Sequence, residues 1–199
     1  MHINWFNIPH SDSRDQSYLH CLERLLEKDI SNVIFKHHFC AFIASQPKGK
    51  RVDFVPKLSQ YKTIHCAGRL YNNTGGVLPG RGDQKPKIDF LKNFKFNISF
   101  ENCSSSGYVT EKIIQPMFTN TIPIYWGAND VHLDFNKKAF INSGDFSSDE
   151  ELIHYIQKVD QDEYEYMKVL SEPWFIDNKV PQNVQPKAIL NFIREEVLK

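Results

Sequence analysis

The sequence predicts an α/β fold, a Rossmann-like parallel sheet with helices on both faces. Short apolar runs of strand length alternate with amphipathic stretches of helical spacing, and most connections between them are short. With 199 residues, of which 41% are apolar and 13% aromatic, the chain is long enough to bury one substantial core. Strand–helix–strand order with short connections favours parallel strands, so we expect ligands to bind outside the carboxyl ends of the strands.

Apolar runs bounded by polar residues or by breakers such as Pro47 and Gly49 predict the strands of the sheet. In chain order these runs are INWFNI (3–8), HHFCAFIAS (37–45), TIHCAG (63–68), FKFNISFE (94–101), TIPIYW (121–126) and KAFIN (138–142). The Gly- and Pro-rich stretch between Gly68 and Pro86 predicts a long loop.

Amphipathic stretches predict the helices between these strands. Pro56 should kink the second helix. The best-marked helix begins with two overlapping capping-box spacings, Ser147 with Glu150 and Ser148 with Glu151. In chain order the predicted helices cover residues 13–28, residues 50–61, a segment that Thr110 opens, and residues 147–159, 161–171 and 185–197.

Charge and cysteine content exclude several classes of function. Lys plus Arg equals Asp plus Glu at 24 each, so no net charge drives the chain toward nucleic acid or an anionic membrane. Any bound anion must be held by local geometry. The cysteines lie far apart without a CxxC pair, which argues against a disulfide framework or a metal site and favours a cytoplasmic protein. No apolar run is long enough for a transmembrane segment.

The segment FENCSSSGYVTEK (100–112) combines residues that could hold a phosphorylated ligand. Gly107 permits close approach of the backbone, and Lys112 in the first turn of a helix can reach a diphosphate. The other interpretation is structural: Thr110 caps the helix, Glu111 is a first-turn acid, and Lys112 is solvated. If Lys112 binds phosphate, its removal should weaken nucleotide binding without changing the melting temperature.

From Phe94 to Trp174 the sequence resembles the fucosyltransferases of glycosyltransferase family ten, the α1,3/α1,4 class that uses GDP-fucose. The resemblance is carried by FKFNISFENCSSSGYVTEKIIQPMFTNTIPIYWGA (94–128) and by the downstream KAFINSGDF (138–146). The upstream segment FCAFIASQPKGKRVDFVPKLSQYKTIHCAG (39–68) is also similar, so the resemblance covers about residues 37–175.

This resemblance implies an inverting, metal-independent transferase of the GT-B type that moves fucose from GDP-fucose to a GlcNAc-containing glycan. It implies catalytic roles for Arg51, Glu111 and Lys112, with the two cations neutralising the GDP phosphates. The donor-binding residues that it implies are Arg51, Glu101, Asn102, Gly107, Tyr108, Thr110, Glu111 and Lys112. It implies no cofactor and no metal ion, and we expect no Asp-x-Asp metal site. Nucleic acid is not an expected partner.

The resemblance also implies a division of the chain. Residues 37–175 would be the donor-binding domain, residues 1–36 a remnant of, or linker to, a missing acceptor domain, and residues 176–199 a C-terminal helix. The general base would belong to the acceptor domain, which a separate chain could supply. Peripheral association with the inner face of the membrane stays open for a full-length form.

Two other classes of function are alternatives to this one. A non-catalytic GDP-sugar-binding module, or an inactive truncated remnant of the enzyme, is the main alternative. An adhesion role for Arg81-Gly82-Asp83 is disfavoured, because the tripeptide is common by chance.

Overall fold

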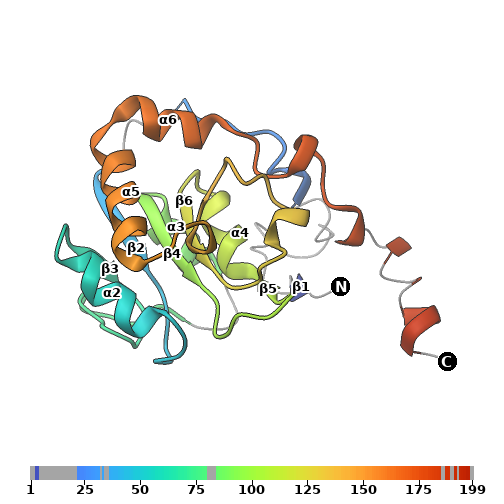
Figure 1. The fold of residues 1–199 in the computed structure, drawn as a ribbon, viewed down its shortest axis with the longest axis horizontal. Coiled ribbons are helices and arrows are strands. Elements are labelled where there is room, and N and C mark those ends of the chain that lie inside the picture. The colour runs from blue at the N-terminus through green and yellow to red at the C-terminus, as the bar shows by residue number, and fades with distance from the viewer. Residues whose placement is uncertain are drawn as a thin grey trace.

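The main element of the fold is a parallel sheet of five strands in the order β3-β2-β4-β6-β7 (Figure 1). The computed structural model describes residues 3–4, 22–31, 33, 36–79, 84–184, 187–188, 191 and 193–197. The strands are β2 (His38–Phe42), β3 (Ile64–Cys66), β4 (Phe94–Phe100), β6 (Ile122–Trp126) and β7 (Ile141–Asn142). They coincide with the predicted apolar runs, and the predicted α/β class is confirmed.

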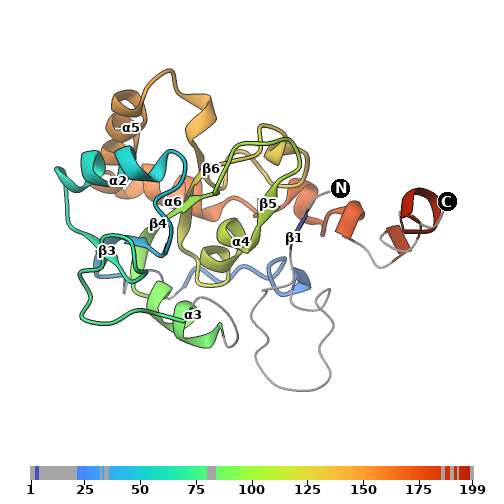
Figure 2. The same ribbon diagram turned by 90° about the horizontal axis from the view of Figure 1, so that it is seen from below.

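Helices cover both faces of this sheet (Figure 2). Helices α2, α5 and α6 lie on one face, and α3 and α4 lie on the other. Their bounds are α2 (Arg51–Ser59), α3 (Lys85–Leu91), α4 (Glu111–Met117), α5 (Asp149–Gln161) and α6 (Glu163–Ser171). The chain passes from β2 outward to β3, and then crosses to β4 on the other side of β2. Right-handed crossovers in opposite directions require helices on opposite faces, which explains the two layers.

Strand β4 is the middle strand of the sheet, between β2 and β6. Its side chains meet both helix layers. Phe100 packs on Phe54 of α2, with ring centroids 4.9 Å apart, and Phe96 meets Tyr166 of α6 at 5.8 Å. On the face covered by α3, Phe94 of β4 packs in a smaller buried cluster with Leu91 of α3 and Ala41 of β2. The predicted single core therefore forms around the strand that leads into FENCSSSGYVTEK.

Several elements differ from the prediction. The prediction lacks helix α3, because Pro86 is typical of the preceding loop, although proline is also well tolerated in the first turn of a helix. The 138–142 run is a strand only at Ile141–Asn142. Two residues of the first run form β1 (Ile3–Asn4), which pairs with the unpredicted β5 (Val109–Thr110) in a separate parallel sheet.

Other predicted features lie wholly or partly outside the described residues. They are the rest of the 3–8 run, most of the 13–28 helix, the tripeptide at 81–83 and part of the 185–197 helix, where Ile193–Val197 is a π-helix. Within the part of the chain that the structure describes, no helix has both the length and the apolar character needed to cross a membrane.

Helix α2 continues through Pro56. Proline has no N–H, so it cannot bond the carbonyl of Val52 one turn earlier. The hydroxyl of Tyr71 donates to the oxygen of Val52 instead, at 3.0 Å. A side chain from the following loop therefore replaces the hydrogen bond that Pro56 removes.

The start of α5 confirms one of the two predicted caps. Ser148 is the N-cap residue, and its hydroxyl accepts the N–H of Glu151 at 3.2 Å. In a capping box the Glu151 carboxylate would accept the backbone N–H of Ser148. Here it accepts the N–H and the hydroxyl of the preceding residue, Ser147, at 2.8 and 2.7 Å. Glu150 pairs with Lys57 of α2 instead of capping its own helix.

The carboxylate of Asp160, at the end of α5, joins the helix layer to the sheet. Its side chain is 2% exposed and accepts hydrogen bonds from Lys62 at 2.5 Å, from Lys95 at 2.7 Å and from the Tyr61 hydroxyl at 2.9 Å. Burial raises the pKa of Asp160, but the hydrogen bonds from Lys62 and Lys95 outweigh burial and hold the pKa below its usual value. The ionised carboxylate is therefore part of what stabilises the fold.

Replacing Asp160 with asparagine should lower the free energy of unfolding at pH 7 by about 1.5–3 kcal/mol, the range for hydrogen bonds to charged groups. Because the folded pKa is depressed, this contribution is present above about pH 4 and is lost as the pH falls through the folded pKa. Urea denaturation from pH 7 to pH 2 should therefore show a weaker pH dependence in the variant below about pH 4.

The matched control is Asp89→Asn, which removes an exposed ion pair with Lys92. Exposed pairs contribute little, so the denaturation midpoint should hardly move. Equal effects of the two substitutions would contradict the role assigned to Asp160.

Candidate functional site

The predicted site residues lie at the point where the strand order reverses. Counted in chain order, the five strands of the main sheet follow the pattern 2-1-3-4-5, and the reversal lies between β2 and β4. Open α/β sheets bind ligands in the crevice at this position, outside the carboxyl ends of the strands. The chain after β2 leads to Arg51, and the chain after β4 begins with Glu101. The topology thus brings together two segments that are about fifty residues apart in the sequence.

Glu101 is the organising residue of this crevice. Its side chain is fully buried, and its carboxylate accepts the backbone N–H of Thr110 at 2.8 Å. The Thr110 hydroxyl lies 2.8 and 2.9 Å from the two carboxylate oxygens, and the Lys112 ammonium lies 2.8 Å from one of them. A buried carboxylate is costly unless it is paired and hydrogen-bonded, and here both conditions are met.

These contacts change the interpretation of the start of α4. Thr110 stands at the N-cap position, but its hydroxyl makes no cap hydrogen bond because it contacts Glu101 and Lys112. Lys112, with 23% of its side chain exposed, is ion-paired with Glu101 instead of pointing freely into solvent. Glu111 is partly buried, and its carboxylate is 4.0 Å from the Lys112 ammonium. The expectation of a simple threonine cap is wrong, and Lys112 has a structural partner.

Arg51 lies under the crevice at the first position of α2. It is 2% exposed, and its Nη2 donates to the carbonyl of Phe100, the last residue of β4, at 2.6 Å. Its buried Nε has no hydrogen-bond partner among the described residues. Burial lowers the pKa of Arg51, while the nearby Glu101 carboxylate and Tyr108 hydroxyl raise it. The structure therefore places a second cation beside Glu101.

The other predicted residues lie on the loop that joins β4 to β5. Asn102 is exposed, whereas Gly107 and Tyr108 are half-buried. Gly107 has a φ of 68°, in the left-handed region that glycine adopts without strain. The structure thus gathers Arg51, Glu101, Thr110, Lys112 and Tyr108 near one another and leaves Asn102 at the surface.

Two residues of the site were missed in the sequence. Lys87 on α3 is 7% exposed. Burial lowers the pKa of Lys87, the Glu111 carboxylate raises it and the Lys112 ammonium lowers it. Lys87 is therefore a third cation, beside Glu111 and Lys112. Gly127 follows β6, and a Cβ atom there would lie 2.4 Å from the Tyr125 hydroxyl and 2.6 Å from the Cγ of Glu101. Recognition of α3 would have pointed to Lys87, but nothing in the local sequence marks the close approach at Gly127.

A small cavity of about 20 Å³ lies inside this part of the sheet. It is lined by residues of β2, β4 and α4, including Asn97, Lys112 and Gln115. Asn97 is 6% exposed, and its Oδ1 has no hydrogen-bond partner among the described residues. The interior beneath the crevice therefore holds three polar side chains among apolar ones.

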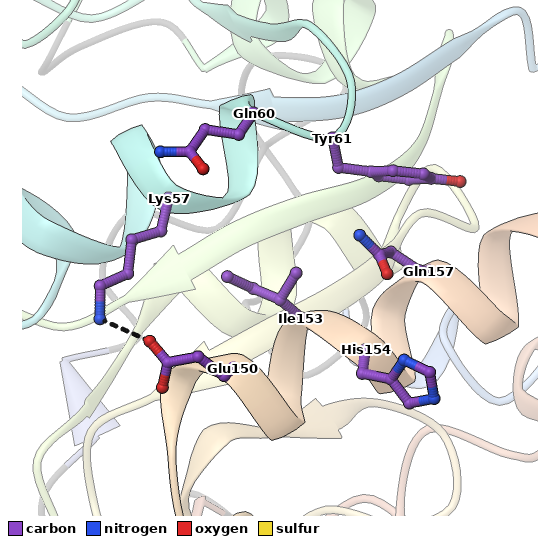
Figure 3. A pocket seen from close by; sticks show the side chains of 7 residues that line it. All are labelled: Lys57, Gln60, Tyr61, Glu150, Ile153, His154 and Gln157. Atoms are coloured by element: carbon purple, nitrogen blue, oxygen red, sulfur yellow. Dashed lines mark hydrogen bonds and ion pairs between the residues drawn. The ribbon is translucent and has the colours of Figure 1, made fainter.

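A larger groove, of about 570 Å³, separates α2 from α5 (Figure 3). Its main charged groups neutralise each other, because the Lys57 ammonium lies 3.1 Å from the Glu150 carboxylate and 3.2 Å from that of Asp149. None of the predicted donor-binding residues lines it. The full lining is Lys57, Gln60, Tyr61, Glu150, Ile153, His154 and Gln157. Size alone does not make this groove the functional site.

The sequence does contain an Asp-x-Asp pattern, at Asp160-Gln161-Asp162. Its carboxylates are committed elsewhere: Asp160 pairs with Lys62 and Lys95, and Asp162 caps α6 by accepting the N–H groups of Tyr164 and Glu165. Within the described ranges, no group of three or more His, Cys, Asp or Glu residues is arranged to hold a metal ion.

Residues 34–188 match the family model described as "Glycosyltransferase family 10 (fucosyltransferase) C-term". The α-(1,3)-fucosyltransferase FucT of Helicobacter pylori is 38% identical over 164 residues, which are 80% of this chain and 33% of that protein. The GDP-fucose protein O-fucosyltransferase 3 of Xenopus tropicalis is 31% identical over 195 residues, which are 89% of this chain and 40% of that protein. The chain therefore spans well under half the length of these two relatives.

Solved structures show the same relationship. The crystal structure of an α1,3-fucosyltransferase with GDP-fucose matches with a TM-score of 0.72 and 36% identity over 87% of this chain and 50% of that one. A crystal structure of an α1,3-fucosyltransferase with GDP matches with a TM-score of 0.74 and 32% identity over 98% of this chain and 60% of that one. Because the family model covers most of its length, this chain belongs to glycosyltransferase family 10, the fucosyltransferases.

Proposed function

We propose that this chain is the donor-binding part of a fucosyltransferase and binds GDP-fucose at the crevice between β2 and β4. The observation that carries the proposal is the set of buried or half-buried cations, Arg51, Lys87 and Lys112, gathered where this fold binds ligands. A chain without net charge can attract a diphosphate only through such a local arrangement. A fucosyltransferase of similar structure has been solved with GDP-fucose, which supports this choice of donor.

Lys112 can serve both Glu101 and a ligand. An ammonium group has three N–H donors, and among the described residues Lys112 donates to Glu101 and to Thr110. The third donor is then available for a phosphate oxygen. Because Glu101 holds the ammonium in position before the ligand arrives, little side-chain entropy is lost on binding.

The same cations suit the chemistry of fucose transfer. Cleavage of the bond between fucose C1 and the β-phosphate oxygen leaves negative charge on the phosphate and positive charge on the sugar. Arg51 and Lys112 would stabilise the leaving GDP without a metal ion, and Glu111 would lie on the side of the developing cation. An acceptor hydroxyl then attacks C1 from the opposite face, with inversion, and a general base takes its proton.

For the acceptor we propose a GlcNAc-containing glycan and an α1,3 or α1,4 linkage. The relative named as an α-(1,3)-fucosyltransferase is 38% identical, against 31% for the relative named as a protein O-fucosyltransferase. The alternative is a GDP-sugar-binding module that performs no transfer on its own. An assay of fucose transfer to N-acetyllactosamine, run beside GDP-fucose binding, separates the two.

The chain should bind GDP and GDP-fucose without a divalent metal ion, since three cations already surround the proposed diphosphate site. Calorimetric titrations in EDTA and in Mg²⁺ should give similar dissociation constants. Competition with UDP and ADP tests the preference for guanine, which is expected from family membership. Loss of GDP binding on chelation would contradict the metal-free site, and equal affinity for the three nucleotides would reduce it to a general diphosphate site.

Lys112→Ala should weaken GDP binding about ten- to 150-fold, because a hydrogen bond to a charged group contributes about 1.5–3 kcal/mol. It should also lower the free energy of unfolding by a similar amount, about 1.5–3 kcal/mol, because Glu101 then remains buried without its cation. Calorimetry and urea denaturation measure the two effects. This replaces the expectation that the melting temperature would not change.

The matched control is Lys168→Ala, whose side chain is 61% exposed, and it should change neither quantity. The double variant Glu101→Gln with Lys112→Ala removes both charges of the ion pair, so its loss of stability should be smaller than the sum of the single losses. GDP binding that stays at the wild-type level in Lys112→Ala would restrict Lys112 to its structural role.

A further inference from the structure

The loop between β4 and β5 must be ordered before it can position a ligand, yet most of it is exposed. Residues 102–106 are exposed and belong to no helix or strand. The loop carries Tyr108, which lies close enough to Arg51 to affect its pKa. Something other than the hydrophobic core must therefore hold it in place.

The contacts that hold this loop come from the segment after β6. The Ser104 hydroxyl donates to the carbonyl of Gly127 at 2.7 Å. Asp130 contacts two consecutive loop residues: one carboxylate oxygen accepts the N–H of Gly107 at 2.7 Å, and the other accepts the hydroxyl of Ser106. Both bonds to Asp130 are charge-assisted, a class about twice as strong as neutral hydrogen bonds.

These bonds act at the residue that determines the direction of the chain. Gly107 adopts a φ of 68°, and Asp130 holds the N–H of that same residue. The next residue, Tyr108, donates its N–H to the carbonyl of Ser105 at 3.0 Å, which closes a tight turn. Fixing Gly107 therefore fixes where the Tyr108 side chain leaves the loop, next to Arg51.

We propose that Asp130 is a positioning residue for the donor, and that it acts by holding the Ser104–Tyr108 loop in its binding conformation. This inference rests on the proposed function, because it assigns the loop to GDP-fucose. Asp130 is half-buried in a connecting segment, so its main role is not core packing. A loop that is already ordered costs less conformational entropy on binding, and this saving appears as affinity.

Asp130→Ala should weaken GDP-fucose binding about tenfold and speed hydrogen exchange at the Gly107 N–H, while exchange in β4 and β6 stays as in the wild type. Saturating GDP-fucose should restore slow exchange in the loop, since the ligand then orders it. Asp130→Asn keeps an oxygen for the Gly107 N–H and should lose less affinity. Ser106→Ala removes only one of the two bonds and provides a milder variant should Asp130→Ala fail to fold.

The control is Asp29→Ala, which removes a carboxylate that accepts the N–H of Ser31 within its own turn. It should leave GDP-fucose affinity and exchange at Gly107 unchanged. Wild-type affinity together with wild-type exchange at Gly107 in both Asp130→Ala and Ser106→Ala would overturn the role of Asp130 and leave the proposed function intact. Failure of the wild-type chain to bind GDP or GDP-fucose would instead overturn the proposed function and the donor role of Asp130 with it.

Discussion

The buried carboxylate of Glu101 is the constraint on which the rest of the candidate site depends. A carboxylate with no solvent exposure requires a cation and several hydrogen-bond donors, and the chain supplies them within eleven residues from Thr110 and Lys112. To do so it must turn back between β4 and α4. The loop, the short strand β5 and the first turn of α4 therefore bring the chain back to the Glu101 carboxylate and supply its partners.

The contacts of Glu101 with Thr110 and Lys112 also determine the electrostatics of the crevice. Lys112 is held by Glu101, and Arg51 lies beside both, so the cations are fixed before any anion binds. Lys87 adds a third positive charge from α3, which lies on the same face of the sheet as α4. The carboxylates of Glu101 and Glu111 partly balance these charges, which keeps the cluster tolerable in the absence of a ligand. Such a preorganised arrangement stabilises an anion without reorganisation when charge develops.

Topology, and not the size of a hollow, decides where the chemistry lies. The groove between α2 and α5 is far larger than the cavity near Asn97, but its principal charges are paired across the two helices (Figure 3). The crevice between β2 and β4 combines the reversal of strand order with a buried cation, Arg51, whose Nε has no hydrogen-bond partner among the described residues. An anionic ligand can therefore bind more favourably in this crevice than in the groove between α2 and α5.

The sequence by itself determined the fold class, the strands of the main sheet and the segment that carries the candidate site. Apolar runs such as FKFNISFE and TIPIYW have the same meaning in isolation as in the fold, because strand formation here follows from burying them. The Ser148 cap was also predictable, since a cap depends on neighbours three residues apart. Helix α3 was missed because Pro86 is compatible both with a loop and with a first helical turn.

Only the tertiary structure decided which charged side chains are buried and which partner each one has. Lys112 looks like any first-turn lysine until Glu101, at the end of the preceding strand, is brought within 2.8 Å of it. Arg51, Asp130 and Gly127 gain their roles from segments that are adjacent only after the parallel crossovers have formed. The physical reason is that local propensity depends on neighbouring residues, whereas pairing and desolvation depend on contacts between distant ones.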